Sequence, residues 1–353
     1  MTEESIHGSF VALRMTRNVN IDTQEYLQQL ITTIPSYSLS EAEQKTIQFE
    51  GIQKYIYLLK IISSKFKASS IPQELDVKIK HNIHQSIIDQ SPIHLTIPFG
   101  GYKKWQLPTY PLPDWAELFN LVLIRDYVSS IAAAYKPGVI IEYFSDEIFV
   151  SRMNNYPQAD LDQYNNEFNN FVTWFSQYLP KNISVKCSKI RDQISQAELM
   201  QRFDVEIEKQ RNQWNQLPED QKNYRLEKSE RNYKADLSSL PIDEKNKILL
   251  ESTLVHDAFI FGDWETGVPW AFGEKMIPIG FRYTGTWGIH LRSSVSSTVQ
   301  FWIGIGALKK RKDSLLPTIL TYQQYLENKS NLTNTQVNII PLPNPNLQSI
   351  LEV

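Results

Sequence analysis

The chain has 353 residues, which is enough for one large domain or for a domain with a sizeable insertion. Its formal net charge of -3 and its 41% of hydrophobic residues are typical of a globular protein, and they argue against binding to nucleic acid or to an anionic membrane. A single cysteine, Cys187, excludes an intrachain disulfide and a multi-cysteine zinc site, and we expect it to be a buried structural thiol. We expect no signal peptide, no membrane-spanning helix and a cytoplasmic location.

Residues 1–92 predict a helical region that packs on the rest of the chain and carries no chemistry. Helices are expected over 22–34, 40–66 and 76–89, and in the second of them apolar residues recur at three- and four-residue spacing.

The following part of the chain alternates strand and helix patterns. Asp114 with Glu117 three residues later forms a capping box at the start of a helix whose apolar residues cover most of its circumference, so we expect that helix to be buried on two sides. The alternation predicts an α/β fold with a Rossmann-like, mostly parallel central sheet and flanking helices. The expected elements are strand 93–99, helix 114–134, strand 139–144, helix 161–178 and strand 183–187.

A charged segment, 193–247, interrupts this pattern. It predicts one or two long solvent-facing helices, broken near Pro218 and Pro241, which form either a lid or a plain charged surface. The remaining chain is strand-rich, so we divide the protein into a helical region 1–92, an α/β catalytic domain 93–327 with the insertion 193–247, and a loosely attached extended tail 328–353. Within 254–327 we expect strands 277–283, 286–292 and 299–306 and a helix over 315–326.

Gly100 and Gly101 follow the first strand of the α/β unit. Glycines permit backbone conformations that expose N–H groups, and Lys103 and Lys104 add positive charge beside them. The segment could therefore hold a phosphate or a carboxylate, or it could be an ordinary turn.

Ser145 and Asp146 follow the strand 139–144, at the edge where open α/β sheets usually build their sites. Asp146 could exchange a proton with a substrate or orient an amine, or it could cap a helix. His290 and Arg292 alternate onto one face of a later strand, where they could serve as an acid/base group and an anion clamp; a histidine with a purely structural environment is the other interpretation.

We expect no metal and no cofactor. His256-Asp257 is a pair that metal-dependent phosphohydrolases use, but the chain lacks the further histidines and aspartates at fixed places that such enzymes need.

Several short motifs follow one another in a specific order. They are Phe99-Gly100-Gly101-Tyr102 with a following lysine, Leu112-Pro113-Asp114-Trp115-Ala116-Glu117, Tyr135-Lys136-Pro137-Gly138, Ser145-Asp146, and Asp160-Leu161-Asp162-Gln163-Tyr164. In this order they resemble the isocyanide (isonitrile) synthase family of the pyoverdine/dityrosine-biosynthesis type. Two later segments, Gly267-Val268-Pro269-Trp270 and Ile289-His290-Leu291-Arg292, echo the same family more faintly.

The resemblance implies an α/β enzyme that converts the α-amino group of an amino acid into an isonitrile. The carbon would come from a ketose phosphate such as ribulose 5-phosphate, and an oxygenase would act downstream. For that chemistry we expect Asp146, His290 and Lys104 to be catalytic. We expect Gly100, Gly101, Lys103, Ser145, Arg152 and Arg292 to bind substrate, with Lys103 or Lys104, Asp146 and Arg292 lining one pocket. The alternatives are a degenerate synthase fold that acts as a non-enzymatic binding module, and another amine–carbonyl or phosphosugar transformation.

Overall fold

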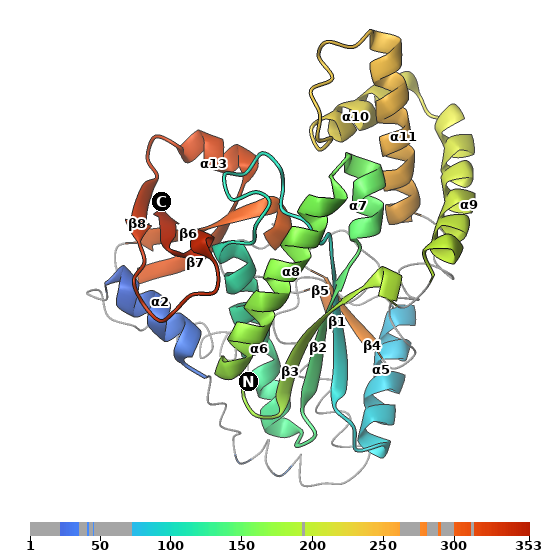
Figure 1. Ribbon diagram of the computed structural model, residues 1–353. Coiled ribbons are helices and arrows are strands. Elements are labelled where there is room, and N and C mark those ends of the chain that lie inside the picture. The colour runs from blue at the N-terminus through green and yellow to red at the C-terminus, as the bar shows by residue number, and fades with distance from the viewer. Residues whose placement is uncertain are drawn as a thin grey trace.

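The computed structural model describes residues 22–34, 41, 45, 73–192, 195–261, 276–280, 289–290, 300–311 and 314–353, and every structural statement below refers to these. They form a five-stranded and a four-stranded sheet with helices between and around them (Figure 1). The helix expected over 40–66 lies almost entirely outside the described residues, as do Arg292 and the segment 267–270.

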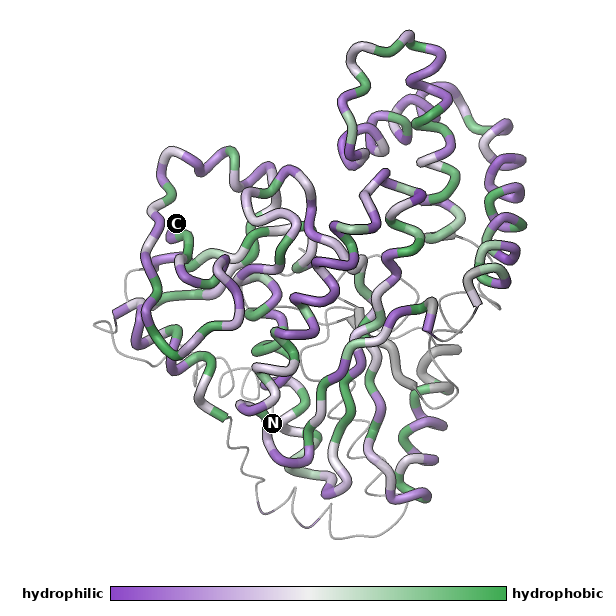
Figure 2. The backbone as a smooth tube through the Cα atoms, viewed as in Figure 1, coloured by the Kyte–Doolittle hydropathy of each residue, from purple (hydrophilic) through white to green (hydrophobic). Residues whose placement is uncertain are grey.

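The larger sheet is parallel, as the alternating pattern predicted. Its order is β3-β2-β1-β4-β5, and each neighbouring pair runs parallel. Hydrophobic residues predominate along the two central strands β1 and β2 (Figure 2), as expected for strands covered on both faces. The bounds are β1 Ile93–Phe99, β2 Val139–Ser145, β3 Ile183–Lys189, β4 Met276–Gly280 and β5 Ile289–His290.

Helix α6, Trp115–Ala134, lies between the two sheets. It contacts β2 and β3 on one side and β6 and β7 on the other, and all of its residues except Ala133 are buried. This explains why its apolar residues cover most of the circumference rather than one stripe, and the expectation of a helix buried on two sides is confirmed. The remaining helices of the α/β unit are α5 Gln73–Ile88, α7 Glu147–Asn154 and α8 Gln158–Phe175, which ends in the short helix η1, Ser176–Tyr178.

The smaller sheet has the order β7-β6-β9-β8 and overturns two expectations about the end of the chain. The helix expected over 315–326 is instead strand β7, Ser314–Thr321, followed by the short helix α13, Tyr322–Asn328, because β7 pairs with β6, Gly304–Arg311, along its whole length. The tail from 328 is not loosely attached: β9, Ser349–Glu352, pairs with β6 and with β8, Thr333–Gln336. Two short helices complete this part, η3 Phe301–Ile303 and η4 Pro345–Leu347.

The charged segment forms helices with breaks near Pro218 and Pro241, as expected. After the short helix η2, Ile190–Asp192, these are α9 Gln196–Asn215, α10 Glu219–Glu230 and α11 Ile242–Phe261, which rise beside α7 (Figure 1). They are more than a solvent-facing surface, because their inner residues form a second hydrophobic core with Phe149 of α7. The division of the chain into three regions stays a prediction.

The first described helix, α2, Thr23–Thr32, joins the C-terminal strand to α6. Thr23 Oγ1 donates a hydrogen bond to Glu352 at 2.6 Å, and the Arg125 guanidinium donates to the backbone oxygens of Ile31 and Leu30 at 2.6 and 2.9 Å. A positive group at the C-terminal end of a helix satisfies its last carbonyls and complements its dipole. None of the described helices combines the length and the apolar character that crossing a bilayer requires.

Candidate functional site

The Gly100-Gly101 turn and the Ser145-Asp146 pair lie side by side at the carboxyl end of the parallel sheet. Phe99 pairs with Ser145 in the register of β1 and β2, and the Asp146 amide donates a hydrogen bond to the Phe99 oxygen at 3.0 Å. Gly101 has a φ of +64°, a conformation that side-chain-bearing residues rarely adopt. Asn165 Nδ2 of α8 donates to its carbonyl oxygen at 2.9 Å and holds the turn in place.

Asp146 is a buried carboxylic acid in an unusual environment. Its Oδ1 is buried and has no hydrogen-bond partner within the part of the chain that the structure describes. Burial raises the pKa of Asp146 well above its usual range, and the adjacent Glu147 carboxylate acts in the same direction. Although Asp146 precedes α7, its side chain makes no capping hydrogen bond, so the interpretation as a helix cap loses its support. Buried polar atoms without a hydrogen-bond partner are rare in folded proteins and occur preferentially at functional sites.

Glu147 is a residue that sequence reasoning missed, although it follows the Ser-Asp pair directly. It is buried and accepts a hydrogen bond from Ser145 Oγ at 2.6 Å. The Glu147 carboxylate thereby orients the Ser145 hydroxyl, which lies between the Gly101 backbone and the start of α7.

Aromatic side chains enclose the same corner. Tyr102 packs against Tyr156 in a tilted arrangement, with ring centroids 4.8 Å apart, and a Cβ atom added to Gly100 would lie 2.8 Å from Trp302 Nε1. Burial raises the pKa of the Tyr102 hydroxyl, and the Asp146 charge raises it further. Tyr102 therefore stays protonated and can donate a hydrogen bond next to Asp146.

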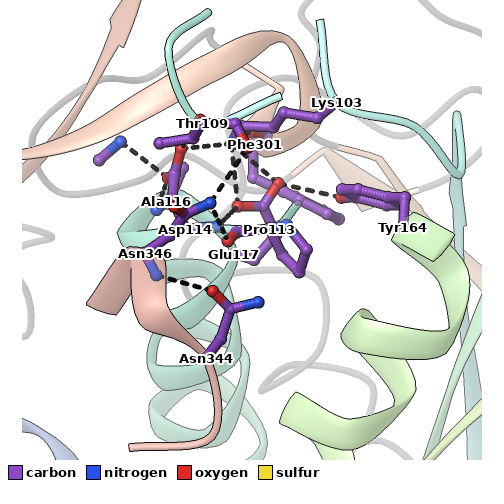
Figure 3. A network of polar contacts seen from close by, with 11 residues as sticks. Lys103, Thr109, Pro113, Asp114, Ala116, Glu117, Tyr164, Phe301, Asn344 and Asn346 are labelled. Atoms are coloured by element: carbon purple, nitrogen blue, oxygen red, sulfur yellow. Dashed lines mark hydrogen bonds and ion pairs between the residues drawn. The ribbon is translucent and has the colours of Figure 1, made fainter. Parts of the chain in front are cut away.

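Lys103 lies in a buried ionic cluster rather than on a pocket wall (Figure 3). Its Nζ is 2.8 Å from Asp114 Oδ2 and 2.9 Å from Glu117 Oε2, and its side chain is 0% exposed. The Tyr164 hydroxyl donates to Glu117 Oε1 at 2.9 Å. The cation that we expected to hold a substrate anion is thus neutralised by the two carboxylates of the capping box.

The same cluster ties the two sheets together. Asp114 Oδ1 accepts hydrogen bonds from the backbone of Ala116 at 2.7 Å and of Gly306, on β6, at 3.1 Å. Burial raises the pKa of Glu117 to about 7, while the charge of Lys103 opposes the shift. The arrangement is that of a structural junction between the glycine turn, α6, α8 and the second sheet.

The other expected site residues are spread over the molecule. Lys104 Nζ donates to Asn232 Oδ1 at 3.1 Å, and burial, with the nearby Arg231, lowers the pKa of its ammonium group. Arg152 is exposed and pairs with Asp204 of α9 at 2.5 Å. The His290 backbone pairs with Gly280 at the far edge of the sheet, three strand spacings from β2, which is roughly 14 Å.

Two histidines lie beside carboxylates. His94 Nε2 is 2.7 Å from Glu142 Oε2 on the neighbouring strand. His256 Nδ1 lies 3.1 Å from Asp257 Oδ1 on α11. Across the described ranges, no three His, Cys, Asp or Glu side chains gather as a metal site. Cys187 is half-buried on β3, and burial raises the pKa of its thiol, so it is a poor nucleophile.

Comparison with known proteins finds a structural relative but no sequence relative. No family model matches the chain, and no curated protein matches it. The PvcA protein from Pseudomonas aeruginosa has a similar crystal structure, with a TM-score of 0.54 and 14% sequence identity. The match covers 85% of this chain and 99% of that one. At this identity the likeness shows a shared fold, which agrees with the α/β fold expected from the sequence.

Proposed function

We propose that the protein is an isonitrile synthase-like enzyme. It would convert the α-amino group of an amino acid into an isonitrile and take the carbon from a ketose phosphate, ribulose 5-phosphate. The observation that carries the proposal is the fold shared with PvcA over nearly all of that chain, combined with the order of family-like motifs from Phe99 to Tyr164. Under this proposal the amino acid and the sugar phosphate are the partners, and an oxygenase consumes the product.

The geometry around Asp146 supports an acid/base role. When an amine adds to a ketone, the nitrogen forms a bond to the carbonyl carbon and the carbonyl oxygen takes up a proton. Burial raises the pKa of the Asp146 carboxyl group, which favours its protonated form, and that form can deliver a proton to the carbonyl oxygen. Tyr102, protonated and adjacent, supplies a second donor for the same oxygen.

Lys104 and His290 fit the proposal less directly. Lys104 has a lowered pKa, which favours the neutral amine that nucleophilic or base chemistry requires. The His290 backbone lies on β5 at the far edge of the sheet, so we assign this residue to the sugar phosphate end rather than to the proton transfer. Arg292, the expected anion clamp, lies outside the described residues.

The test is product formation by the purified protein with each amino acid and ribulose 5-phosphate, detected by tetrazine trapping and mass spectrometry. Asp146→Asn removes the acid with little change in size and should abolish the product. Asp220→Asn, on the exposed first turn of α10, is the matched control and should leave it unchanged. Absence of product with every amino acid would contradict the proposal.

A second candidate is a non-enzymatic binding module on the same fold. It is favoured by one observation: two of the expected anion anchors, Lys103 and Arg152, already pair with the protein's own carboxylates. A module of this kind would bind an amino acid or a sugar phosphate without consuming it, so isothermal titration with product analysis separates the two candidates.

A further inference from the structure

A cavity lies where the C-terminal end of α7 meets α10 and α11. Its volume is about 310 Å³, which is at the lower end of the range for small-molecule sites. Most of its lining residues have polar or charged side chains, with Met153 as the exception. Helix α10 lies within the charged segment and α11 begins in it, and the proposed function gives this segment no role.

Positive charge exceeds negative charge on these walls. Asp257 is neutralised by Arg225, whose Nη1 lies 2.5 Å from Asp257 Oδ2. Lys228 Nζ lies 3.4 Å from His256 Nε2, so a second cation and an imidazole stand beside that pair. Among the lining residues of the cavity, Asp257 is the sole carboxylate, whereas Arg225 and Lys228 are both cations.

Hydroxyl and amide groups complete the lining. Ser252 is 2% exposed, and its Oγ is buried with no hydrogen-bond partner among the residues that the structure places. Ser229 Oγ and Thr253 Oγ1 share a hydrogen bond of 2.7 Å, and Asn154 and Asn232 add amides. A buried hydroxyl without a partner costs free energy unless a bound molecule satisfies it.

We propose that this cavity is a second binding site, separate from Asp146, for a small hydroxyl-bearing oxyanion: a phosphate or carboxylate held by Lys228 and Arg225, with its hydroxyl groups bound by Ser252 and the neighbouring amides. Met153 stands seven residues from Asp146 along α7, which places the cavity roughly 10 Å from the proposed acid. Asn232, on the cavity wall, accepts a hydrogen bond from Lys104 Nζ, so a ligand in the cavity would affect Lys104, close to the glycine turn.

Isothermal titration of the full chain with glycerol 3-phosphate, lactate, inorganic phosphate and glycerol tests the proposal. We expect saturable binding of glycerol 3-phosphate or lactate, which distinguishes a phosphate from a carboxylate ligand, and no binding of neutral glycerol. Lys228→Gln should weaken this binding at least tenfold, because it removes a charge-assisted contact. Lys222→Gln, on the same helix but outside the cavity, is the matched control and should bind as the unaltered chain does.

Ser252→Ala is a second variant with a minimal change in size. It should weaken the binding of glycerol 3-phosphate more than the binding of inorganic phosphate. Asp146→Asn should leave the titration unchanged, which separates this proposal from the proposed function. No binding of any of the three anions, or equal binding by the Lys228→Gln and Lys222→Gln variants, would overturn the proposal. Thermal unfolding of each variant verifies that it is folded before titration.

Discussion

A Cβ atom placed on Gly101 would lie 1.9 Å from Ser145 Oγ, well inside the distance of contact between non-bonded atoms. The glycine turn is thus closed against the end of β2, and no side chain fits between them. This contact fixes the glycine turn against the segment that carries Asp146.

Gly101→Ala should destabilise the protein by about 2–5 kcal/mol, because it combines a left-handed backbone conformation with an overlap in a packed corner. Chemical denaturation measures this loss. Gly138→Ala is the matched control: Gly138 has a φ of +82°, and its Cβ would meet the Asn182 oxygen at 1.8 Å, at the opposite end of β2. Both variants should lose stability, but only Gly101→Ala should also impair activity under conditions where both are folded.

Lys103→Met should lower the free energy of unfolding by about 3–5 kcal/mol, because it leaves two buried carboxylates without their cation. Adding Glu117→Gln to that variant should recover part of the loss, since it removes one of the two unpaired charges. A double-mutant cycle, built from the free energies of unfolding of the two single variants and the double variant, gives the coupling energy between Lys103 and Glu117. Additive losses would show that Lys103 and Glu117 do not act as a buried pair.

Glu142 predicts a loss of stability in acid. Burial alone would raise its pKa, but hydrogen bonds from His94, Lys186 and Ser188 outweigh that effect and lower the pKa of Glu142 to about 2. The folded state therefore binds fewer protons than the unfolded state at pH values between the folded pKa and the usual value of 4.5, and stability falls as the pH drops through that range. Denaturation curves at several pH values give the free energy of unfolding as a function of pH, and this free energy should change less with pH in Glu142→Gln than in the unaltered chain. An unchanged slope would contradict the assignment.

The protonation of Asp146 should control the loss of activity at high pH. If its protonated form delivers the proton to the carbonyl oxygen, the rate should fall as the pH rises through its raised pKa. Replacing Glu147 with Gln removes the charge that helps to raise this pKa, so the fall should begin at a lower pH. A profile that moves to higher pH, or does not move, in Glu147→Gln would rule out this mode of action.

The sequence predicted the elements whose local pattern and packing agree. Strand 93–99 and the helix capped by Asp114 occur as expected, because the alternation of apolar residues, the capping box and the glycine turn all indicate the same boundaries. The helix predicted over 315–326 was wrong. The leucines of this segment favour a helix in isolation, whereas pairing with β6 makes most of the segment a strand. Pro317 was the signal against that helix: β7 is an edge strand, where proline is tolerated.

The sequence predicted only those parts of the candidate site that lie at the ends of adjacent strands. That the glycine turn meets Ser145-Asp146 follows from adjacent parallel strands ending at one edge. Which lysine becomes buried does not follow from the sequence, because Lys103 is fixed by the carboxylates at the start of α6 and by the backbone oxygen of Phe301, 198 residues away. The cavity between α7, α10 and α11 likewise depends on how distant helices pack, which composition alone does not encode.

The most direct test of the proposed function is the mass of the trapped product when the ribulose 5-phosphate is uniformly labelled with carbon-13. The account predicts an isonitrile adduct one mass unit heavier than with unlabelled sugar phosphate, absent in Asp146→Asn and present in Asp220→Asn. An adduct of unchanged mass, or no adduct with any amino acid, would contradict it.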